Sequence, residues 1–332
     1  MTLKLTSFLS AAVLALLSQA AVAGEITLRA SHQWPGGRGD PRDEMVHVMA
    51  RALEAQGVGL SIRVFPGASL YKPREQWGAL TKGQLDLAVF PLDYAAGRHP
   101  QFSVTLMPGL VRNHARALRM KDSDFMKDIK KIIEGAGVVV VSDAWIAGAF
   151  ASKKHCITDP ESMRGQVTRA AGPAFEQMLA AAGASISSMP SSEIYIGMQT
   201  GVLDAANTST SSFVSFRLNE QVVCITAPGE NALWFMYEPI LMSKQSWQRL
   251  SPEQQAAVLR AGAAAEEFFN AATVEDDQKM IKAFRGAGVE VIEMSRENFD
   301  AWLAVAKESA YRKFAEDVPG GRGLIEKALA VE

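Results

Sequence analysis

One arginine stands where its side chain could bind an anion. In the run from Val167 to Pro173, Arg169 lies near the end of a short β-branched segment, just before a turn and a helix. That position directs a guanidinium out of the edge of a sheet and into a cleft. Arginine keeps its proton in such a place, and its planar fork matches the two oxygens of a carboxylate. The run therefore favours a receptor for a small organic anion over an enzyme.

Neutral polar residues follow another predicted strand of the same region. Asn207 and Thr208 carry hydrogen-bond donors and acceptors that could fix a second oxygen of the anion. We interpret both side chains as candidate ligand contacts. Asn and Thr after a strand are also ordinary turn residues, so a purely structural role stays open.

Aromatic residues and one histidine complete the candidate pocket. His32 and Trp34 follow the first strand, at the carboxyl end where α/β sheets expose their ligands. Trp34 could cover the cleft, since a large ring excludes water at small conformational cost. The further candidates for aromatic walls lie at predicted strand ends or crossovers: Tyr94, Trp145, Phe213 and Trp234. Any of these rings could instead belong to the hydrophobic core, and His32 could be part of a structural hydrogen bond.

The elements that must position these residues alternate between strand and helix. Alternating or continuous apolar runs predict strands, and apolar residues at i, i+3, i+4 and i+7 predict the helices between them. In the first half we expect strands at 25–30, 60–64, 85–90 and 138–141 and helices at 41–53, 73–82 and 113–134. The alternation restarts with strands at 165–170 and 185–188 and helices at 173–182 and 193–200. Two such units predict parallel sheets whose faces are covered by helices.

Two later segments connect these units. An apolar run at 235–242 predicts a strand that returns to the first unit. Ser251 and Gln254 form a capping box around Pro252, and an alanine-rich helical pattern continues to about Arg285. A helix of some 33 residues spans roughly 50 Å, longer than one small domain is wide, so it must bridge both units. We expect an α/β fold of two lobes with a hinge and a long lobe-spanning helix.

The beginning of the chain predicts export. Lys4 gives a positive n-region, residues 8–17 an apolar core and residues 21–23 a small-residue cleavage site, so residues 1–23 read as a signal peptide. The apolar core is shorter than the roughly 20 residues of a transmembrane helix. We expect cleavage after Ala23 and a location in the periplasm. The predicted limits are 24–146 and 235–274 for lobe I, and 147–234 and 275–332 for lobe II.

Composition excludes some partners and leaves the cysteines undecided. The chain is 48% hydrophobic and 21% charged with a formal net charge of −2, as in an ordinary globular protein. It lacks the basic stripe of a nucleic-acid-binding protein, so we expect no nucleic-acid partner. Cys156 and Cys224 could form one disulfide in an oxidising compartment, or remain as two buried thiols.

The sequence lacks the common signatures of hydrolases and metalloenzymes. It has no Gly-x-Ser-x-Gly elbow and no glycine-rich phosphate loop. The five histidines, at positions 32, 47, 99, 114 and 155, show neither of the zinc spacings His-x-x-x-His and His-x-x-Glu-His. We therefore expect no enzymatic activity, no cofactor and no metal, although catalytic groups can also converge from distant positions.

Several separate blocks resemble the extracytoplasmic solute-binding proteins of tripartite ATP-independent periplasmic (TRAP) transporters, the DctP-like family. The blocks lie, in order, at 64–66, 83–87, 163–169, 189–195 and 198–204, followed by the long helix after Ser251. The resemblance covers essentially the whole mature chain. It implies a periplasmic-binding-protein-like fold that closes on a small organic acid and delivers it to the membrane subunits of a TRAP permease. We expect a monomer.

The resemblance also bears on the ligand. The family's selectivity arginine falls on Arg169, but the second pocket arginine of the sialic-acid-binding branch falls near Gly148, which has no side chain. The acidic residue often found after the block that starts at Thr200 is replaced, since Asn207 and Thr208 follow Ala206. These departures argue against sialic acid. Separately, one candidate arginine among neutral and aromatic neighbours favours a monocarboxylate. A periplasmic sensor for a signalling partner is the alternative, and gene neighbourhood would discriminate between the two.

Overall fold

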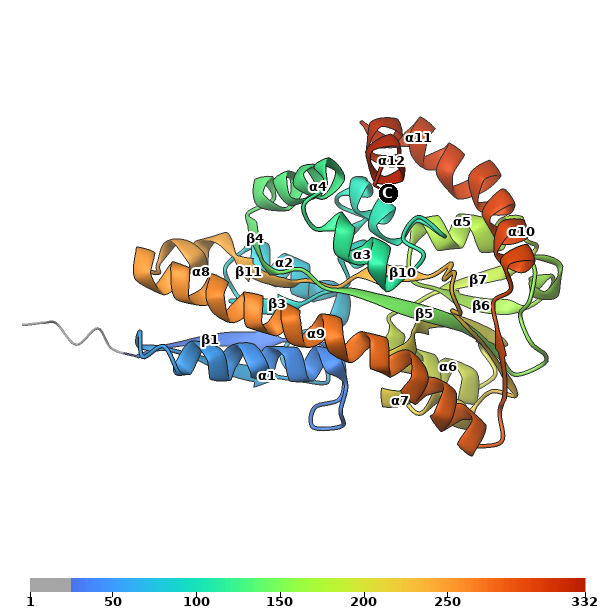
Figure 1. Cartoon of the computed structure of the whole chain (residues 1–332), viewed down its shortest axis with the longest axis horizontal. Coiled ribbons are helices and arrows are strands. Elements are labelled where there is room, and N and C mark those ends of the chain that lie inside the picture. Colours follow the sequence, from blue (N-terminus) through green and yellow to red (C-terminus); the bar gives the residue numbers. More distant parts are fainter. Residues whose placement is uncertain (1–24, 332) are drawn as a thin grey trace, which may run out of the picture.

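Two mixed β-sheets, each with helices packed on it, form the two lobes of the protein (Figure 1). The computed structural model describes residues 25–331. The expected signal peptide and residue 332 lie outside the described residues. Within the described part of the chain, no helix combines the length and the apolar character needed to cross a membrane.

The first sheet has five strands in the order β2-β1-β3-β11-β4. Strands β1 and β2 run parallel, β1 and β3 run parallel, and β11 is antiparallel to both β3 and β4. The strands span Ile26–Ser31 (β1), Leu60–Phe65 (β2), Leu87–Val89 (β3), Val138–Ser142 (β4) and Ile240–Ser243 (β11). Their helices span Pro41–Glu54 (α1), Gln76–Thr81 (α2), His114–Met120 (α3) and Asp124–Gly135 (α4). The expected parallel sheet is therefore mixed.

The single helix expected at 113–134 is two helices. Asn113 caps α3, and the side chain of Ser123 accepts a hydrogen bond from the backbone N–H of Met126, which starts α4 after a short turn. Each serine or asparagine at such a position satisfies a backbone donor that the first helical turn leaves unpaired. The prediction missed this break because the apolar periodicity on either side of Ser123 continues almost in phase.

The second sheet contains seven strands, and most of the functional candidates lie on it. Its order is β12-β9-β5-β8-β6-β7, and β10 also pairs with β5. The strands span Trp145–Ser152 (β5), Val167–Ala170 (β6), Ser185–Ser188 (β7), Ala205–Ser209 (β8), Cys224–Ala227 (β9), Phe235–Tyr237 (β10) and Glu290–Glu293 (β12). The helices of this lobe span Pro173–Ala181 (α5), Ile194–Gln199 (α6) and Thr210–Ser215 (α7). Strands β5, β9 and β12 were not predicted from the sequence.

The chain crosses between the sheets at three places. Residues 143–144 join β4 to β5, and residues 238–239 join β10 to β11, so the apolar run at 235–242 forms two strands, one in each sheet. These two crossings lie side by side, because the backbone N–H of Glu238 donates to the carbonyl of Ala144 at 2.8 Å. The lobe limits given above remain a prediction.

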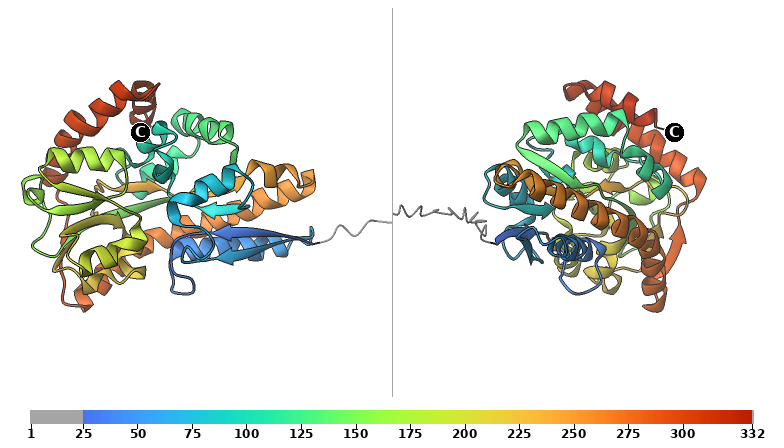
Figure 2. Two further views of the ribbon diagram at one scale, coloured as in Figure 1. Left: turned by 180° about the vertical axis from the view of Figure 1, so that it is seen from behind. Right: turned by 60° about the vertical axis from the view of Figure 1, so that its left-hand side comes forward.

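Helix α9 (Pro252–Gly286) makes the third crossing. It begins with the expected capping box of Ser251 and Gln254. It packs on α1 and β4 at one end and on α7 and β12 at the other. Figures 1 and 2 show this helix running along both sheets, so the prediction of a long lobe-spanning helix is confirmed.

The C-terminal helices pack on both lobes. They comprise α10 (Arg296–Ala306), a π-helical turn at Lys307–Tyr311, α11 (Arg312–Asp317) and α12 (Gly321–Leu329). Helix α10 packs against α5, and α12 packs against α4. The hydroxyl of Tyr311 donates to the carbonyl of Pro108 at 3.0 Å, and the guanidinium of Arg116 donates to the carbonyl of Ala328 at 3.1 Å. These bonds attach the end of the chain to the segment that contains α3.

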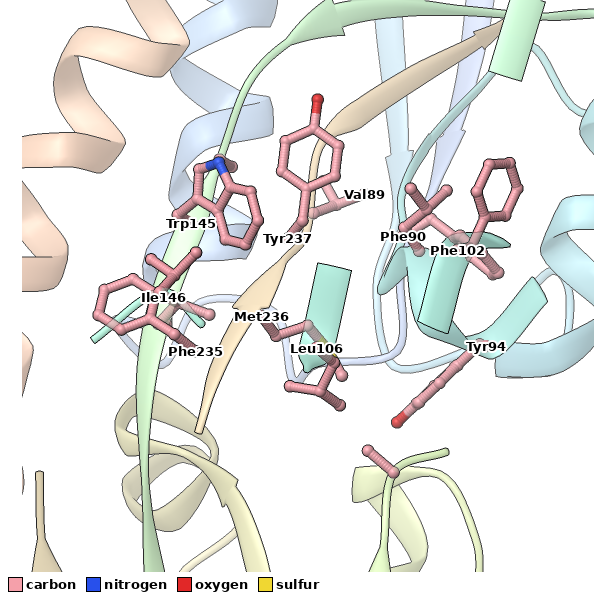
Figure 3. Packing of buried hydrophobic residues seen from close by; sticks show 14 of the residues in the cluster. Val89, Phe90, Tyr94, Phe102, Leu106, Trp145, Ile146, Phe235, Met236 and Tyr237 are labelled. Carbon is pink, nitrogen blue, oxygen red and sulfur yellow. The ribbon is translucent and has the colours of Figure 1, made fainter. Parts of the chain in front are cut away.

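Buried aromatic residues fill the region between the sheets. Trp145 at the start of β5 packs against Tyr237 of β10, with ring centroids 5.0 Å apart (Figure 3). A separate, smaller cluster lies in the second lobe and contains Phe213 and Phe284. The hydrophobic contacts thus continue from the first lobe into the crossing strands.

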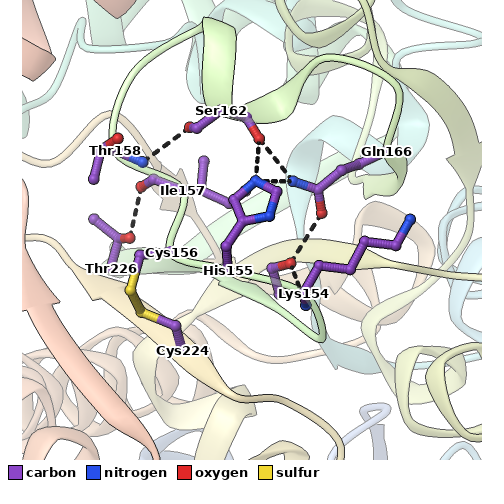
Figure 4. Close-up of a disulfide and its surroundings, with 10 residues drawn as sticks. Lys154, His155, Cys156, Ile157, Thr158, Ser162, Gln166, Cys224 and Thr226 are labelled. Atoms are coloured by element: carbon purple, nitrogen blue, oxygen red, sulfur yellow. Dashed lines mark hydrogen bonds between the residues drawn. A yellow bond between two sulfur atoms is a disulfide. The ribbon is translucent and has the colours of Figure 1, made fainter.

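The structure joins Cys156 and Cys224 in a disulfide, with Cα atoms 5.0 Å apart (Figure 4). The bond connects the segment after β5 to the first residue of β9, two neighbouring strands. Beside it, the carbonyl of Ser162 accepts hydrogen bonds from the side chains of His155 and Gln166. Of the two states that the sequence left open, the structure has the disulfide.

Candidate functional site

Arg169 lies on the four-residue strand β6, between β7 and β8. The backbone N–H of Val167 donates to the carboxylate of Asp204 at 3.0 Å, which fixes the start of this short strand. The side chain of Arg169 does not face bulk solvent, since the residue is only 1% exposed. A guanidinium in such a position has lost most of its hydration and needs partners inside the protein or in a ligand.

The protein partners of Arg169 are all neutral. Its Nε donates to the carbonyl of Met189 at 2.9 Å, one Nη to the carbonyl of Asn207 at 2.8 Å, and the other Nη to the hydroxyl of Tyr94 at 3.0 Å. These bonds use three of the five N–H donors of the guanidinium. Among residues 25–331, no carboxylate lies within 4.0 Å of it. Burial lowers the pKa of Arg169, as expected for a cation without an ion-pair partner.

Tyr94 connects the two lobes at this point. It belongs to a 3-10 turn, η2 (Leu92–Ala95), that follows β3 in the first lobe. Its hydroxyl accepts from Arg169 and, at 3.0 Å, from the backbone N–H of Ser191, both in the second lobe. Gln33 of the first lobe donates to the same oxygen at 3.4 Å. In Figure 3 the hydroxyl points away from Phe90 and Phe102, so the ring has one apolar and one polar end.

Two amide oxygens near this cluster are buried without a protein donor. Asn207 donates its side-chain N–H to the carbonyl of Arg169 at 2.7 Å, but its Oδ1 has no hydrogen-bond partner among the described residues. The Oε1 of Gln33 is likewise buried and has no hydrogen-bond partner among the described residues. Thr208, the residue after Asn207, is also buried. Both residues lie within β8, and not after a strand as the sequence suggested. Unpaired polar atoms inside a protein are costly, so oxygens of this kind beside a buried cation are suited to bind a polar ligand.

Trp234 occupies the space beside Gly148. A Cβ atom on Gly148 would lie 2.3 Å from Cε3 of Trp234 and 2.3 Å from the carbonyl oxygen of Thr208. The backbone N–H of Gly148 also donates to the carbonyl of Trp234 at 2.9 Å. An indole therefore stands where any larger residue at position 148 would have to extend. The Nε1 atoms of Trp234 and Trp145 are buried without a described partner.

His32 and Trp34 are held by other side chains of the first lobe. The Nε2 of His32 lies 3.1 Å from a carboxylate oxygen of Asp43, and its ring stacks on Trp34 with centroids 5.9 Å apart. Burial opposes ionisation of Asp43, but the hydrogen bonds from His32 and from the backbone N–H of Gly37 lower its pKa overall. The second imidazole nitrogen of His32 is buried without a described partner. One side of His32 therefore has a structural hydrogen bond, and the other side is unpaired.

Phe213 is placed differently from the other candidates. It is fully buried in the second hydrophobic cluster, where its ring meets Phe284 edge-on at 5.8 Å. No described contact joins it to Arg169, Tyr94 or Asn207. The structure thus brings Arg169, Tyr94 and Asn207 into one cluster and places Phe213 outside it.

Sequence reasoning missed two charged residues near Arg169. Asp93 is 2% exposed, and burial raises its pKa to about 7, with a further rise from the charge of Glu176. Its carboxylate packs against Gly172, where a Cβ would come within 1.8 Å of Oδ2. Arg74 lies over the ring of Tyr94, with Cζ 5.3 Å from the ring centroid. A lone acid in the apolar run after β3 was the available signal for Asp93, whereas nothing local distinguished Arg74 from a solvated cation.

One group of potential metal ligands exists among the described residues. It consists of Cys156, Cys224 and Glu290. Both sulfur atoms belong to the disulfide and cannot act as thiolates. This group is therefore not suited to hold a metal ion.

A family model agrees with this architecture. The model for bacterial extracellular solute-binding proteins of family 7, DctP, matches residues 30–317. The chain belongs to this family. The resemblance found in the sequence is thereby confirmed, and so are the α/β fold class and the membership among TRAP solute-binding proteins.

Individual DctP relatives extend over nearly the whole chain. A crystal structure of a TRAP periplasmic solute binding protein from Rhodoferax ferrireducens, with bound malonate, superposes with a TM-score of 0.88 at 35% identity and covers 91% of this chain and 96% of its own. A solute-binding protein of Albidiferax ferrireducens is 35% identical over 91% of this chain and 90% of its own length. The 2,3-diketo-L-gulonate-binding periplasmic protein YiaO of Escherichia coli is 26% identical over 82% of both chains. The names of these relatives describe binding proteins.

Proposed function

We propose that this protein is the periplasmic receptor of a TRAP transporter, that it captures a small organic acid by closing its two lobes on Arg169, and that it delivers the acid to the membrane permease. The observation that carries the proposal is the buried guanidinium of Arg169, which has neutral protein partners and two N–H donors not used by them. A carboxylate would supply the missing charge and accept both remaining donors. The malonate bound by the relative with 35% identity supports a ligand of this class.

The same proposal includes the processing and state of the protein. We propose export with cleavage after Ala23 and action as a monomer. Ligand contacts would come from Arg169, Tyr94, Asn207 and Thr208, with indole N–H donors from Trp145 and Trp234 and less direct parts for His32 and Trp34. One buried cation without an acid partner supports a single directly paired carboxylate. The rest of the ligand would then be neutral and rich in oxygen.

A thermal-shift screen tests the proposal. The probes are malonate, succinate, pyruvate, lactate and glucuronate, each added to the mature protein. A ligand present at 100 times its Kd raises the free energy of unfolding by about 2.7 kcal/mol. We expect at least one acid to raise the melting temperature of the wild type.

Variants at two arginines show whether the site is the one described. Arg169→Lys should lose most of the shift, because an ammonium cannot reproduce the planar fork. Arg164→Lys is the matched control, since Arg164 is an exposed arginine that pairs with Glu161 at the surface. The proposal is wrong if no organic acid shifts the wild type, or if Arg169→Lys responds like the wild type.

A further inference from the structure

A second buried arginine, Arg42, lies between the lobes with a different set of partners. It is the second residue of α1, and its side chain is fully buried. Its Nε and one Nη donate to the two carboxylate oxygens of Asp40, at 2.8 and 2.7 Å. Glu238, at the crossing between β10 and β11, accepts from the other Nη at 3.1 Å. The Cζ of Arg42 lies over the ring of Trp34, 4.1 Å from the ring centroid.

The remaining donors of Arg42 reach across to the second lobe. They go to the hydroxyls of Ser209 and Ser212, at 2.7 and 3.1 Å. Ser209 is the last residue of β8 and caps α7, since its side chain accepts from the backbone N–H of Ser212. All five N–H donors of Arg42 are therefore used by protein acceptors. Arg42 has nothing left to offer a ligand, in contrast to Arg169.

The division of these partners between the lobes has a physical consequence. Asp40 neutralises Arg42 from within the first lobe, two residues away in the chain. Separation of the lobes would therefore break only the bonds to the two serines and would leave no buried cation unpaired. Burial alone would lower the pKa of Arg42, but Asp40 and Glu238 raise it overall, so the guanidinium stays charged in either arrangement. Hydrogen bonds from the charged guanidinium to neutral hydroxyls stabilise the contact between the lobes. These bonds can break again when the lobes separate.

We propose that Arg42 is a closure clamp: a charge-compensated group of the first lobe that holds the closed state through Ser209 and Ser212 of the second lobe without contacting the ligand. This inference rests on the proposed function, since it assumes that the lobes close around an acid. It assigns Arg42 a positioning role, whereas Arg169 selects the ligand. The clamp and the ligand site meet on adjacent positions of β8, where Asn207 and Thr208 precede Ser209.

Stopped-flow measurement of the intrinsic tryptophan fluorescence tests the clamp. The probes are malonate and whichever acid of the screen gives the largest shift. Ser212→Ala removes one acceptor and keeps the Ser209 cap, and Arg42→Lys keeps the charge beside Asp40 but not the fork. We expect both variants to release the acid roughly tenfold faster with an almost unchanged association rate, because the clamp forms only after the acid has entered. The ratio of affinities for the two acids should stay as in the wild type.

Ser211→Ala is the matched control. It removes a buried hydroxyl of the same helix whose hydrogen bond goes to Asp276 of α9 instead of to Arg42. Its release rate should equal that of the wild type. Circular dichroism and the melting temperature without ligand show that each variant is folded before its rates are compared.

Each outcome has one meaning. Unchanged release rates in folded Ser212→Ala and Arg42→Lys would overturn the clamp while leaving the proposed function intact. A changed affinity ratio would also overturn it, because Arg42 would then act on the ligand. If the wild type binds none of the acids, the proposed function fails and the clamp fails with it.

Discussion

Arg169 and Arg42 are both buried, yet their surroundings differ in charge. Arg42 has two carboxylates as partners, and Arg169 has two carbonyls and a tyrosine hydroxyl. A buried cation is stable only when its lost hydration is replaced. For Arg42 the protein supplies the replacement, whereas for Arg169 it supplies only neutral acceptors, and we propose that a ligand provides the charge. The chemistry of the site therefore depends on which acceptors surround each guanidinium and less on the presence of arginine itself.

Tyr94→Phe should weaken binding of the acid about tenfold. The variant removes the hydroxyl that accepts from Arg169 and from Ser191, and hydrogen bonds to charged groups contribute about 1.5–3 kcal/mol. Isothermal titration calorimetry with the best acid of the screen measures the change. Tyr71→Phe is the control, since the hydroxyl of Tyr71 bonds to the carbonyl of Gln84 outside the cluster. Equal losses in both variants would contradict a specific role of Tyr94.

Asp93 should make the stability of the protein depend on pH. Burial, together with the charge of Glu176, raises its pKa from an ordinary 3.8 to about 7. The folded state then holds a proton that the unfolded state has released, so the free energy of unfolding falls as pH rises from about 4 to about 7 and is level above. Glu238, whose pKa is also raised by burial to about 7, acts in the same direction.

Asp93→Asn should remove one of these two contributions. We expect its free energy of unfolding to fall less steeply between pH 4 and pH 7, by up to about 1.4 kcal/mol per pH unit. Urea titrations at a series of pH values measure the slope. The control is Asp122→Asn, which changes an exposed carboxyl. If Asp93→Asn and the control variant show equal slopes, the raised pKa of Asp93 is contradicted.

At the level of elements, the contact between β5, β8 and Trp234 depends on the absence of a side chain at position 148. Gly148→Ala places a methyl group 2.3 Å from both the indole and the carbonyl of Thr208, and that carbonyl cannot move without separating β5 from β8. We expect a loss of about 3 kcal/mol or more in the free energy of unfolding.

The control for Gly148 is another glycine with open space around it. A Cβ on Gly286, at the end of α9, would meet no atom within 4 Å. Gly286→Ala should therefore raise the free energy of unfolding by about 0.5–1 kcal/mol, because alanine favours a helix. Urea denaturation of both variants measures whether the free energy of unfolding falls for Gly148→Ala and rises for Gly286→Ala. A neutral Gly148→Ala would contradict the packing described for Trp234.

Some elements were predictable because their signals are local. The capping box of Ser251 and Gln254 predicted the start of α9, and Asp40 with Pro41 predicted the start of α1. Strand β5 was missed because its residues Trp145–Ser152 are all buried. Such a segment shows neither the two-residue period of a half-buried strand nor the 3.6-residue period of an amphipathic helix. Strands β9 and β12 are four residues long and obtain their pairing from distant partners. Short segments of this kind are decided by tertiary pairing and not by their own composition.

At the scale of the whole molecule, the three crossings between the two sheets predict a hinge. Two of them are short segments, at 143–144 and 238–239, and the third is the helix α9. A ligand shifts the balance between open and closed states only by its preference for the closed one. We expect small-angle X-ray scattering to show a smaller radius of gyration when the wild type is saturated with its best acid.

Arg169→Gln provides the comparison for this experiment. It keeps the size of the side chain roughly similar and removes the charge that would hold the carboxylate. The same concentration of acid should leave its radius of gyration unchanged. If the wild type binds the acid tightly and shows no compaction, the hinge is wrong even though the receptor is right.

The sequence by itself determined the family, the two α/β lobes and the long bridging helix, since each depends on local periodicity, caps or contiguous motifs. The ligand-binding role of Arg169 stays a prediction. Only the tertiary structure decided that Cys156 and Cys224 are joined, that Tyr94 meets Arg169 across the lobes, and that Phe213 belongs to the core. The tertiary structure also showed that Arg42 is paired with carboxylates of the protein, whereas Arg169 has neutral partners. The reason is physical: partners such as Arg42 and Ser209 are 167 residues apart, and no local pattern records which distant acceptor will neutralise or bind a buried charge.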